Sequence, residues 1–306
     1  MALSKTLIVI VGPTAVGKTA LAIKVARHLN TEIISADSRQ FFAEMEIGTA
    51  KPSMEELQAA PHHFIGSHHI QELFSTGDFE AQVISLLDDL FLKKDEVVMV
   101  GGSGLYVNAV VNGLDDLPQT DLAIRAALND RFQEEGLDGI KAELATLDPE
   151  YFAVVDQFNT QRLIRGLEFV LSTGKKLSSF QLYTKKTRPF NILKIGLNKD
   201  RADLYAQINA RVDHMMASGL LDEVRGLLLF REVNALKTVG YAELFDYLDG
   251  NCSLEEAVDK IKQNTRRFAK RQLTWFRKDQ EIVWFEPNQT TEILEYIDKS
   301  INVGLS

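Results

Sequence analysis

Near its N-terminus the chain reads Leu7-Ile8-Val9-Ile10-Val11-Gly12-Pro13-Thr14-Ala15-Val16-Gly17-Lys18-Thr19. The β-branched run 7–11 predicts a buried strand, and the pattern of residues 20–29 predicts a helix. The residues between them match G-x-x-x-x-G-K-[ST] in the strand, loop and helix context that this motif requires. We therefore predict a phosphate-binding loop, with backbone N–H groups and Lys18 on phosphate oxygens and the Thr19 hydroxyl on Mg²⁺. The loop alone does not distinguish a nucleoside triphosphate from another diphosphate.

Further apolar runs predict the rest of a sheet. Residues 33–34, 97–100 and 192–197 each indicate a short strand, and helical patterns separate them, including one over 79–90 with Asp78 as its N-cap. Apolar strands that alternate with helices are typical of an α/β fold with a parallel sheet covered on both faces. Residues 115–188 contain no strand-like run and are helical by pattern. We predict a core of residues 1–114 and 189–306 and an inserted all-helical domain of residues 115–188.

Besides helices over residues 200–219 and 241–248, two further helices are predicted in the C-terminal third. One covers residues 220–230, and a longer one begins at Ser253, whose spacing from Glu256 is that of a capping box, and ends near Lys278. The apolar stripe of this second helix consists of Leu254, Val258, Ile261, Thr265, Phe268, Gln272 and Trp275.

The charge of the chain is unevenly distributed. The 43 acidic residues outnumber the 34 basic ones, giving a net charge of -9, which by itself argues against a polyanionic partner. Residues 160–190, however, contain seven basic residues and one acid, and residues 260–278 contain eight basic residues and no acid. Like charges at i,i+4 destabilise a helix, so the second segment is expected to meet an anion. That anion is either an RNA backbone or acidic groups elsewhere in the chain.

The position of the acidic residues suggests a general base. Phosphate loops of ATPases usually pair with an acid at the end of a neighbouring strand, yet the strand 97–100 ends in Gly101-Gly102. The strand 33–34 instead places Asp37 at the carboxyl edge of the sheet, where ligands of open parallel sheets bind. Asp37 is therefore the candidate for proton abstraction. The alternative is that Asp37 caps a turn at Ser38.

The cysteine content and the length of the apolar runs restrict the expected cellular location and cofactors of the protein. Cys252 is the only cysteine, so neither a disulfide framework nor a cysteine-based zinc cluster is expected. No stretch approaches the roughly 20 apolar residues of a membrane span. We expect a cytoplasmic, soluble protein with no membrane partner. The histidines at 62, 63, 68 and 69 lack carboxylate or cysteine partners at ligand spacing, which disfavours a metal site there.

Ordered motifs along the chain resemble one family, the tRNA dimethylallyltransferases, also called isopentenyl-tRNA transferases. After the phosphate loop, the matching segments are Asp37-Ser38-Arg39-Gln40, Ile47-Gly48-Thr49-Ala50-Lys51-Pro52, His62-His63, Gly101-Gly102-Ser103-Gly104-Leu105-Tyr106, Gln161-Arg162-Leu163-Ile164-Arg165, Val239-Gly240-Tyr241, and residues 265–277. They occur in family order over nearly the whole chain. The departures are Glu46 in place of Asp, Gly66 in place of an acid, and Gly166 in place of Ala.

The resemblance implies a P-loop NTPase-like core with a helical insertion. It implies transfer of the dimethylallyl group of dimethylallyl diphosphate to the adenine next to the anticodon on its 3′ side, with the phosphate loop holding the diphosphate. Asp37 would accept a proton from the exocyclic amine. Lys18, Mg²⁺ on Thr19, and Arg211 would neutralise the leaving diphosphate.

The same resemblance implies which residues contact tRNA. Some would surround the target adenine, with Ser103 keeping the hydroxyl of the commoner Thr, and others would face the anticodon arm. The predicted set is Asp37, Ser38, Arg39, Gln40, Ser103, Arg125, Gln161, Arg162, Arg165, Arg266 and Lys270.

Two other functions remain compatible with the residues. A small-molecule or nucleotide kinase would use the same loop for ATP but would leave the basic segment 260–278 unexplained. An RNA-binding regulator with a vestigial phosphate loop would bind RNA without the diphosphate donor. We expect the protein to be a monomer.

Overall fold

The computed structural model describes residues 5–180 and 185–303. The chain forms two compact units, a core of residues 1–112 with 187–306 and an insertion unit of residues 113–186. Both borders lie two residues before the predicted ones. Lys186 forms an ion pair with Asp116, and a Cβ on Gly113 would lie 2.6 Å from the Lys186 side chain. The two connecting segments therefore already meet inside the insertion unit.

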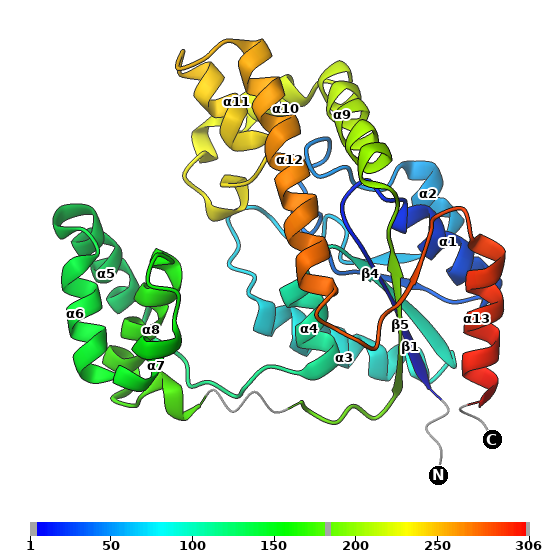
Figure 1. Ribbon diagram of the computed structural model, residues 1–306, viewed down its shortest axis with the longest axis horizontal. Coiled ribbons are helices and arrows are strands. Elements are labelled where there is room, and N and C mark those ends of the chain that lie inside the picture. The colour runs from blue at the N-terminus through cyan, green and yellow to red at the C-terminus, as the bar shows by residue number, and fades with distance from the viewer. Residues whose placement is uncertain (1–4, 181–184, 304–306) are drawn as a thin grey trace. The chain divides into compact units, whose positions relative to one another are not determined.

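A parallel sheet forms the centre of the core unit (Figure 1). Its strands lie in the order β3-β2-β4-β1-β5-β6, and every pair is parallel. The four predicted strands are confirmed as β1, β2, β4 and β5, and the short edge strands β3 and β6 were not predicted. The strands are β1 (Thr6–Val11), β2 (Ile33–Ser35), β3 (His62–His63), β4 (Glu96–Gly101), β5 (Asn191–Leu197) and β6 (Val283–Phe285).

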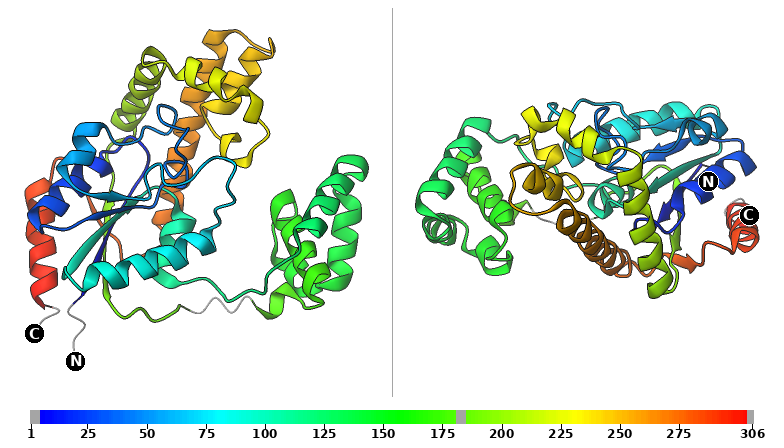
Figure 2. Two further views of the ribbon diagram at one scale, coloured as in Figure 1. Left: turned by 180° about the vertical axis from the view of Figure 1, so that it is seen from behind. Right: turned by 90° about the horizontal axis from the view of Figure 1, so that it is seen from above.

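Helices cover both faces of this sheet, as Figures 1 and 2 show. One apolar cluster joins the sheet to α3 (Thr76–Phe91) and α4 (Gly104–Asn112). The other joins it to α1 (Lys18–His28), α9 (Arg201–Ala217) and α13 (Thr290–Val303). This arrangement confirms the predicted α/β class. The N-cap of α3 is Ser75 and not Asp78, because Asp78 closes a capping box from the third helical position.

A third apolar cluster extends the core unit beyond the carboxyl edge of the sheet. It contains α10 (Leu220–Gly226), α11 (Tyr241–Leu248) and the first half of α12 (Leu254–Phe276). The predicted helix over 220–230 is too long, since a separate 3-10 turn covers Leu228–Phe230. A short helix, α2 (Met54–Ala59), follows the segment 47–52 and begins with a capping box at Ser53.

The buried face of α12 differs from the predicted stripe. Phe268 and Trp275 are 38% and 43% exposed, whereas Ala269 and Phe276 are buried. Over the last turns of α12, the residues that face the core therefore lie one position later in the sequence than hydropathy predicted. Gln272 is the one polar residue of α12 that is buried.

The insertion unit consists of helices, as predicted for this stretch. They are α5 (Leu122–Glu135), α6 (Asp138–Leu147), α7 (Pro149–Val154) and α8 (Thr160–Thr173), followed by a 3-10 turn at Leu177–Ser179. Apolar side chains from all four helices share one cluster. A Cβ on Gly166 would lie 2.4 Å from the ring of Tyr151, which explains why glycine is suited to this position of α8.

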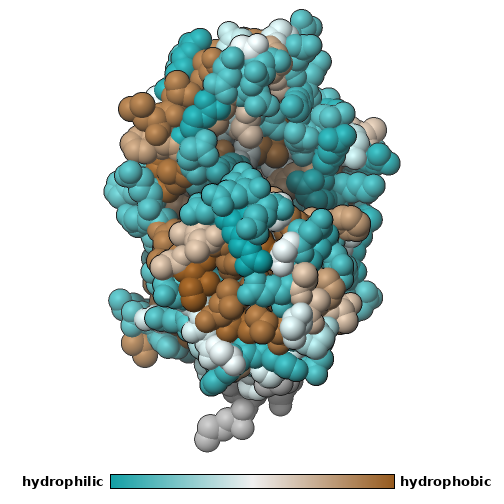
Figure 3. Space-filling view, turned by 90° about the vertical axis from the view of Figure 1, so that its left-hand side faces the viewer, coloured by the Kyte–Doolittle hydropathy of each residue, from teal (hydrophilic) through white to brown (hydrophobic). Residues whose placement is uncertain are grey.

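The surface carries scattered apolar side chains. Leu229 and Phe158 are 94% and 92% exposed. The face in Figure 3 shows brown patches within a mostly hydrophilic surface. Over the described residues, the helices are all too short or too polar to cross a membrane.

Candidate active site at the phosphate-binding loop

The segment 12–17 forms the turn between β1 and α1 that the motif predicted. Gly12 and Gly17 have φ angles of +149° and +102°, a region that favours glycine. A Cβ on Gly12 would also lie 2.5 Å from the carbonyl oxygen of Leu197, at the end of the neighbouring strand β5. Gly17 is the N-cap of α1, so the loop places backbone N–H groups at a helix N-terminus.

Lys18 is the first residue of α1, directly after this turn. Its Nζ donates a hydrogen bond to the carbonyl oxygen of Pro13 over 2.7 Å. Desolvation lowers the pKa of Lys18 to about 8; the nearby carboxylate of Asp37 opposes this shift and Arg211 adds to it. The ammonium group is therefore close to both residues that were assigned to catalysis, and an arriving anion would stabilise its charged form.

Gln272 holds the phosphate loop against the neighbouring strand. Its side chain accepts a hydrogen bond from the backbone N–H of Thr14 and donates one to the carbonyl oxygen of Gly102, over 2.8 and 2.9 Å. Gln272 had been predicted only as part of the apolar stripe of α12. Its polar side chain in that stripe, a property it shares with Thr265, was the signal of its role.

Asp37 follows β2 in a turn, and the alternative role, in which it caps this turn, is observed. Its Oδ1 accepts a hydrogen bond from the backbone N–H of Arg39 over 3.1 Å, so it does shape a turn. It also acts electrostatically on Lys18 and Arg211. The Ser103 hydroxyl accepts a hydrogen bond from the backbone N–H of Ser38 over 3.0 Å and donates one to the Ser38 hydroxyl over 3.1 Å. The turn after β2 is thereby fixed to the loop after β4.

The two following predicted residues support neighbouring loops. Gln40 donates hydrogen bonds to the carbonyl oxygens of Thr49 and Ala50 over 3.2 and 3.1 Å. Arg39 contacts the carbonyl oxygen of Asn234 over 3.4 Å, and desolvation lowers its pKa. Gln40 thus orients the segment 47–52, while Arg39 lies beside Asp37 and Tyr106.

A carboxylate from α10 holds the start of the segment 47–52. Glu223 accepts hydrogen bonds from the backbone N–H groups of Glu46, Ile47 and Gly48 over 2.7 to 3.1 Å, and from the Tyr241 hydroxyl over 2.6 Å. The ring of Tyr241 packs where a Cβ on Gly48 would be, at 2.6 Å. Glu223 was not predicted, because its partners are backbone groups far away in the sequence.

Arg211 on α9 and the phosphate loop line one cavity of about 400 Å³. The guanidinium contacts the carbonyl oxygen of Ala50 over 3.5 Å, and desolvation lowers its pKa although Asp37 and Glu56 oppose this shift. The cavity also contains residues that were not predicted. Its lining is Ala15, Gly17, Lys18, Thr19, Ala20, Ala50, Lys51, Pro52, Glu56, Gln207 and Arg211. One loop glycine, Gly17, and three cations, Lys18, Lys51 and Arg211, thus line one cavity.

The model of one protein family, described as IPP transferase, matches residues 40–279. The chain is 54% identical over 301 residues to tRNA dimethylallyltransferase of Christiangramia forsetii, covering 98% of this chain and 100% of that protein. It is 49% identical over 298 residues to tRNA dimethylallyltransferase 1 of Bacteroides fragilis, covering 97% and 99%. The chain belongs to the tRNA dimethylallyltransferase family.

Solved structures of this family share the fold. The tRNA isopentenylpyrophosphate transferase of Bacillus halodurans has a TM-score of 0.72 and 38% identity, covering 98% of both chains. A eukaryotic dimethylallyltransferase, whose structure is described as acting on tRNA, has a TM-score of 0.75 and 27% identity, covering 89% of this chain and 70% of its own. These likenesses confirm the P-loop NTPase-like class of the core.

Within the insertion unit, the residues assigned to the anticodon arm form one cluster on α5 and α8. Arg125 donates to the buried carboxylate of Glu168 over 2.7 Å and to Gln161 over 2.9 Å. Arg165 lies 3.2 Å from Glu168 and contacts Thr120 over 2.7 Å. These two arginines are thus partly neutralised.

Arg162 differs from the two arginines of this cluster. Its side chain is exposed and makes no hydrogen bond or ion pair within residues 5–180 and 185–303. Of the three predicted arginines, it is the one whose charge is fully available to a phosphate of the family's RNA substrate.

Among the described residues, the basic helix α12 meets internal acids in its first half only. Lys262 and Lys260 pair with Asp213 and Asp246, over 2.6 and 3.5 Å. Arg266 donates to Asn209 over 2.6 Å. Lys270 is exposed and makes no ion pair in the part of the chain that the structure describes. Internal acids therefore neutralise the first half of this segment, and its second half remains basic.

The histidines at 62–69 contact residues of the core. His63 lies 2.7 Å from Glu32, His69 lies 2.9 Å from Glu44, and the ring of His68 stacks on Phe74 at 3.8 Å. Gly66 has a φ of +57°, so glycine suits the position where the family usually has an acid. Across the described residues, no three of the His, Cys, Asp and Glu side chains form a metal-binding group.

Proposed function

We propose that this chain transfers the dimethylallyl group of dimethylallyl diphosphate to the exocyclic amine of the adenine on the 3′ side of a tRNA anticodon. The observation that carries the proposal is the cavity in which the phosphate loop and Arg211 meet near Asp37. Membership of the tRNA dimethylallyltransferase family supports the same reaction.

The reaction needs three contributions from the protein. The amine nitrogen forms a bond to the allylic carbon while the bond from that carbon to the diphosphate oxygen breaks, and the amine loses a proton. Asp37 is placed to accept this proton as a general base. Lys18 and Arg211 stabilise the negative charge that develops on the leaving diphosphate. Their lowered pKa values reflect positive charge held without full solvation, which an anion compensates.

Mg²⁺ is part of the proposal. The oxygen donors at the cavity are the Thr19 hydroxyl and the Glu56 carboxylate, the ligand type that Mg²⁺ prefers, together with diphosphate oxygens and water. Glu56 also caps α2, where Oε2 accepts a hydrogen bond from the Ser53 backbone N–H. When bound, Mg²⁺ would supply further charge neutralisation of the diphosphate.

For the RNA, we propose two sets of contacts. Ser38, Gln40 and Ser103 surround the place of the target adenine, which leaves its stack to reach a protein pocket. Arg162 and the cluster of Arg125, Gln161 and Arg165 contact the anticodon arm, and Arg39, Arg266 and Lys270 add charge on the core. A monomeric state and a cytoplasmic location stay predictions.

The direct test incubates the protein with dimethylallyl diphosphate, Mg²⁺ and unmodified tRNA carrying adenine after the anticodon. We expect a prenylated adenine by nucleoside mass analysis and one diphosphate released per modified adenine. A parallel reaction with ATP and small acceptors tests the kinase alternative. Phosphoryl transfer without prenylation would replace the proposed function.

Asp37→Asn tests the general base. We expect kcat to fall by roughly 10² to 10⁴, because the amide cannot accept the proton, while the dissociation constant for tRNA changes little. Asp88→Asn, an exposed carboxylate on α3, is the matched control and should keep full turnover. If Asp37→Asn abolishes tRNA binding along with turnover, Asp37 positions the RNA and another group takes the proton.

A further inference from the structure

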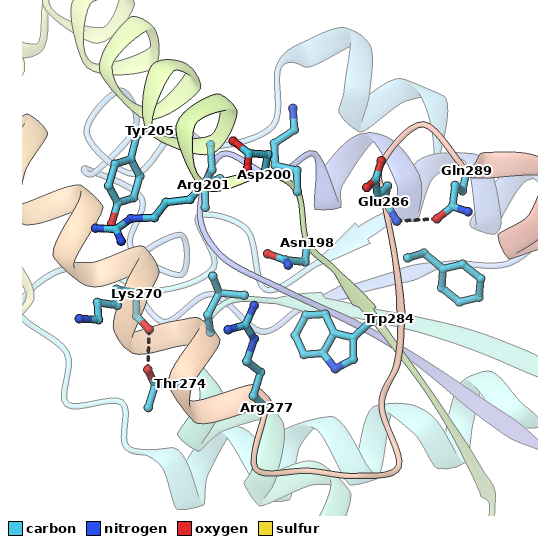
Figure 4. A pocket seen from close by; sticks show the side chains of 14 residues that line it. Asn198, Asp200, Arg201, Tyr205, Lys270, Thr274, Arg277, Trp284, Glu286 and Gln289 are labelled. Atoms are coloured by element: carbon cyan, nitrogen blue, oxygen red, sulfur yellow. Dashed lines mark hydrogen bonds between the residues drawn. The ribbon is translucent and has the colours of Figure 1, made fainter.

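A second cavity, of about 720 Å³, lies beyond the carboxyl ends of β5 and β6 and beside the last turns of α12 (Figure 4). It shares no lining residue with the cavity at the phosphate loop. Apart from Lys270, which was already assigned to the RNA, neither the proposed transfer reaction nor the comparisons give its lining a role. Its lining is Asn198, Lys199, Asp200, Arg201, Leu204, Tyr205, Lys270, Leu273, Thr274, Arg277, Trp284, Phe285, Glu286 and Gln289.

Aromatic groups form part of the wall. Trp284 of β6 is half-buried and lies next to Arg277 in the middle of the cavity (Figure 4). On the α9 side, the Arg201 guanidinium lies over the ring of Tyr205, 5.1 Å from its centre. Aromatic faces and guanidinium planes are the groups on which unpaired bases stack.

The cavity also has an excess of available positive charge. Lys199, Lys270 and Arg277 make no ion pair in the described ranges 5–180 and 185–303. The two lining carboxylates differ in availability: Asp200 accepts hydrogen bonds from the first N–H groups of α9, whereas Glu286 is exposed. The cations outnumber these acids, so the cavity attracts an anion.

Polar groups complete the lining. The side-chain amide of Asn198 makes no hydrogen bond among the described residues and lies between the α9 end and Trp284 (Figure 4). Gln289 accepts a hydrogen bond from the Glu286 backbone N–H over 2.8 Å, which leaves its NH₂ group as a donor. An amide that can both donate and accept suits the edge of a nucleobase.

We propose that this cavity binds one unpaired nucleotide of the RNA substrate, other than the target adenine. The base stacks beside Trp284 with its edge near Asn198, and its phosphates contact Arg277 and Lys199. The proposal rests on the proposed function, since it assumes an RNA substrate.

The spacing of the cations favours an RNA strand over a free nucleotide. Lys270 and Arg277 are two turns apart on α12, about 10 Å along its axis. Arg266 continues the row one further turn toward the N-terminus of the helix, beside Tyr205. A row of this length matches a run of several phosphates and exceeds what one monophosphate can contact.

The experiment compares the double variant Lys199→Gln/Arg277→Gln with the wild type and with Arg27→Gln, an exposed cation of α1 without an ion pair in the described chain. We expect the KM and the dissociation constant for tRNA to rise about tenfold in the double variant, with kcat at saturating tRNA unchanged. The slope of log affinity against log salt should fall by about 1.4, for two lost single-strand phosphate contacts. Arg27→Gln should match the wild type.

A second readout tests stacking directly. In a Trp275→Phe background, Trp284 is the remaining tryptophan, and its fluorescence should be quenched on binding tRNA. Unchanged tRNA affinity and salt slope in the double variant would overturn the proposal. Quenching by adenosine monophosphate, together with unchanged tRNA affinity, would assign the cavity to a free nucleotide instead. Failure of the wild type to prenylate tRNA would contradict the proposed function, whereas normal prenylation by an unaffected double variant would contradict only this inference.

Discussion

The core cavity and the insertion unit both contain arginines, but they differ in what neutralises them. In the core, Arg211 and Lys18 donate to backbone carbonyl oxygens and make no carboxylate ion pair in the described chain. In the insertion unit, Arg125 and Arg165 share the buried carboxylate of Glu168.

This difference separates a binding site from a structural support. A desolvated cation without an ion pair costs folding energy that an anionic ligand compensates, so it indicates ligand binding. A cation paired with a buried carboxylate is already satisfied, and its first effect is on the stability and shape of its unit. The comparison predicts that equivalent substitutions will affect activity in the core and stability in the insertion unit.

Arg211→Gln should give the largest effect. We expect kcat/KM for dimethylallyl diphosphate to fall by roughly 10² to 10³, because one charged donor to the leaving group is lost. The melting temperature should not fall, since removal of a desolvated charge relieves a cost of folding. Steady-state kinetics and thermal unfolding check both points.

The matched control for Arg211→Gln is Arg225→Gln. Arg225 is an exposed arginine of α10 that pairs with Asp222, so both activity and stability should stay near wild type. A lower melting temperature in Arg211→Gln with normal turnover of the folded protein would remove the distinction between the two regions.

Glu168→Gln should give the next largest effect and act on stability. Burial alone would raise the pKa of Glu168, but hydrogen bonds from Thr120 and Arg125 and the charge of Arg165 lower it below its ordinary value. The substitution leaves two arginines unpaired. We expect a loss of about 1 to 3 kcal/mol in the insertion unit, less than for a fully buried pair because both arginines are partly exposed.

Hydrogen exchange can locate this loss. Both tryptophans, Trp275 and Trp284, are in the core, so tryptophan fluorescence follows core unfolding while amide exchange of residues 113–186 follows the insertion unit. Because the folded pKa of Glu168 lies below the unfolded value, its contribution is present above pH 4.5 and is lost as the pH falls through the folded pKa. Glu143→Gln removes a pair with Arg131 in which, unlike Glu168, the carboxylate is partly exposed, so it should change exchange less. Faster exchange in the core instead would contradict the assignment.

A feature of the fold could be predicted from the sequence when its signal lies within a few neighbouring residues. The strand, turn and helix at residues 7–28 were readable because apolar periodicity and glycine spacing are local. The same holds for the helix that begins after Ser253, whose capping box spans four residues. The edge strand β3 consists of two histidines and so has no apolar run, whereas β6, which has the same length as the predicted strand β2, was missed.

The contacts that support the site join residues far apart in the sequence, so local patterns could not predict them. Gln272 reaches Thr14 across 258 positions, and Glu223 reaches Gly48 across 175. Neither contact can be recognised from the composition or the residue spacing near either partner. Glu168 was counted only as one acid among basic residues, and its burial between Arg125 and Arg165 depends on how α5 packs on α8. Arg211 was assigned by family resemblance alone.

The pH dependence of donor binding gives the smallest expected effect and tests whether Lys18 is poised for an anion. Its pKa of about 8 means that the free protein loses this positive charge as the pH rises above 8. The dissociation constant for dimethylallyl diphosphate should then rise up to tenfold per pH unit, since only the ammonium form binds the anion well. Titration calorimetry at pH 8 in buffers of different ionisation enthalpy should show about half a proton taken up per donor bound.

Lys18→Met is the control for this titration, and it should bind weakly with no such dependence between pH 7 and 9.5. In the insertion unit, by contrast, amide exchange should change over this range only through the intrinsic rate. A wild-type affinity that is flat from pH 7 to 9.5 would mean that Lys18 keeps its proton in the free protein. The core cation would then be as well satisfied as those of the insertion unit, and the difference between the two regions would rest on Arg211 alone.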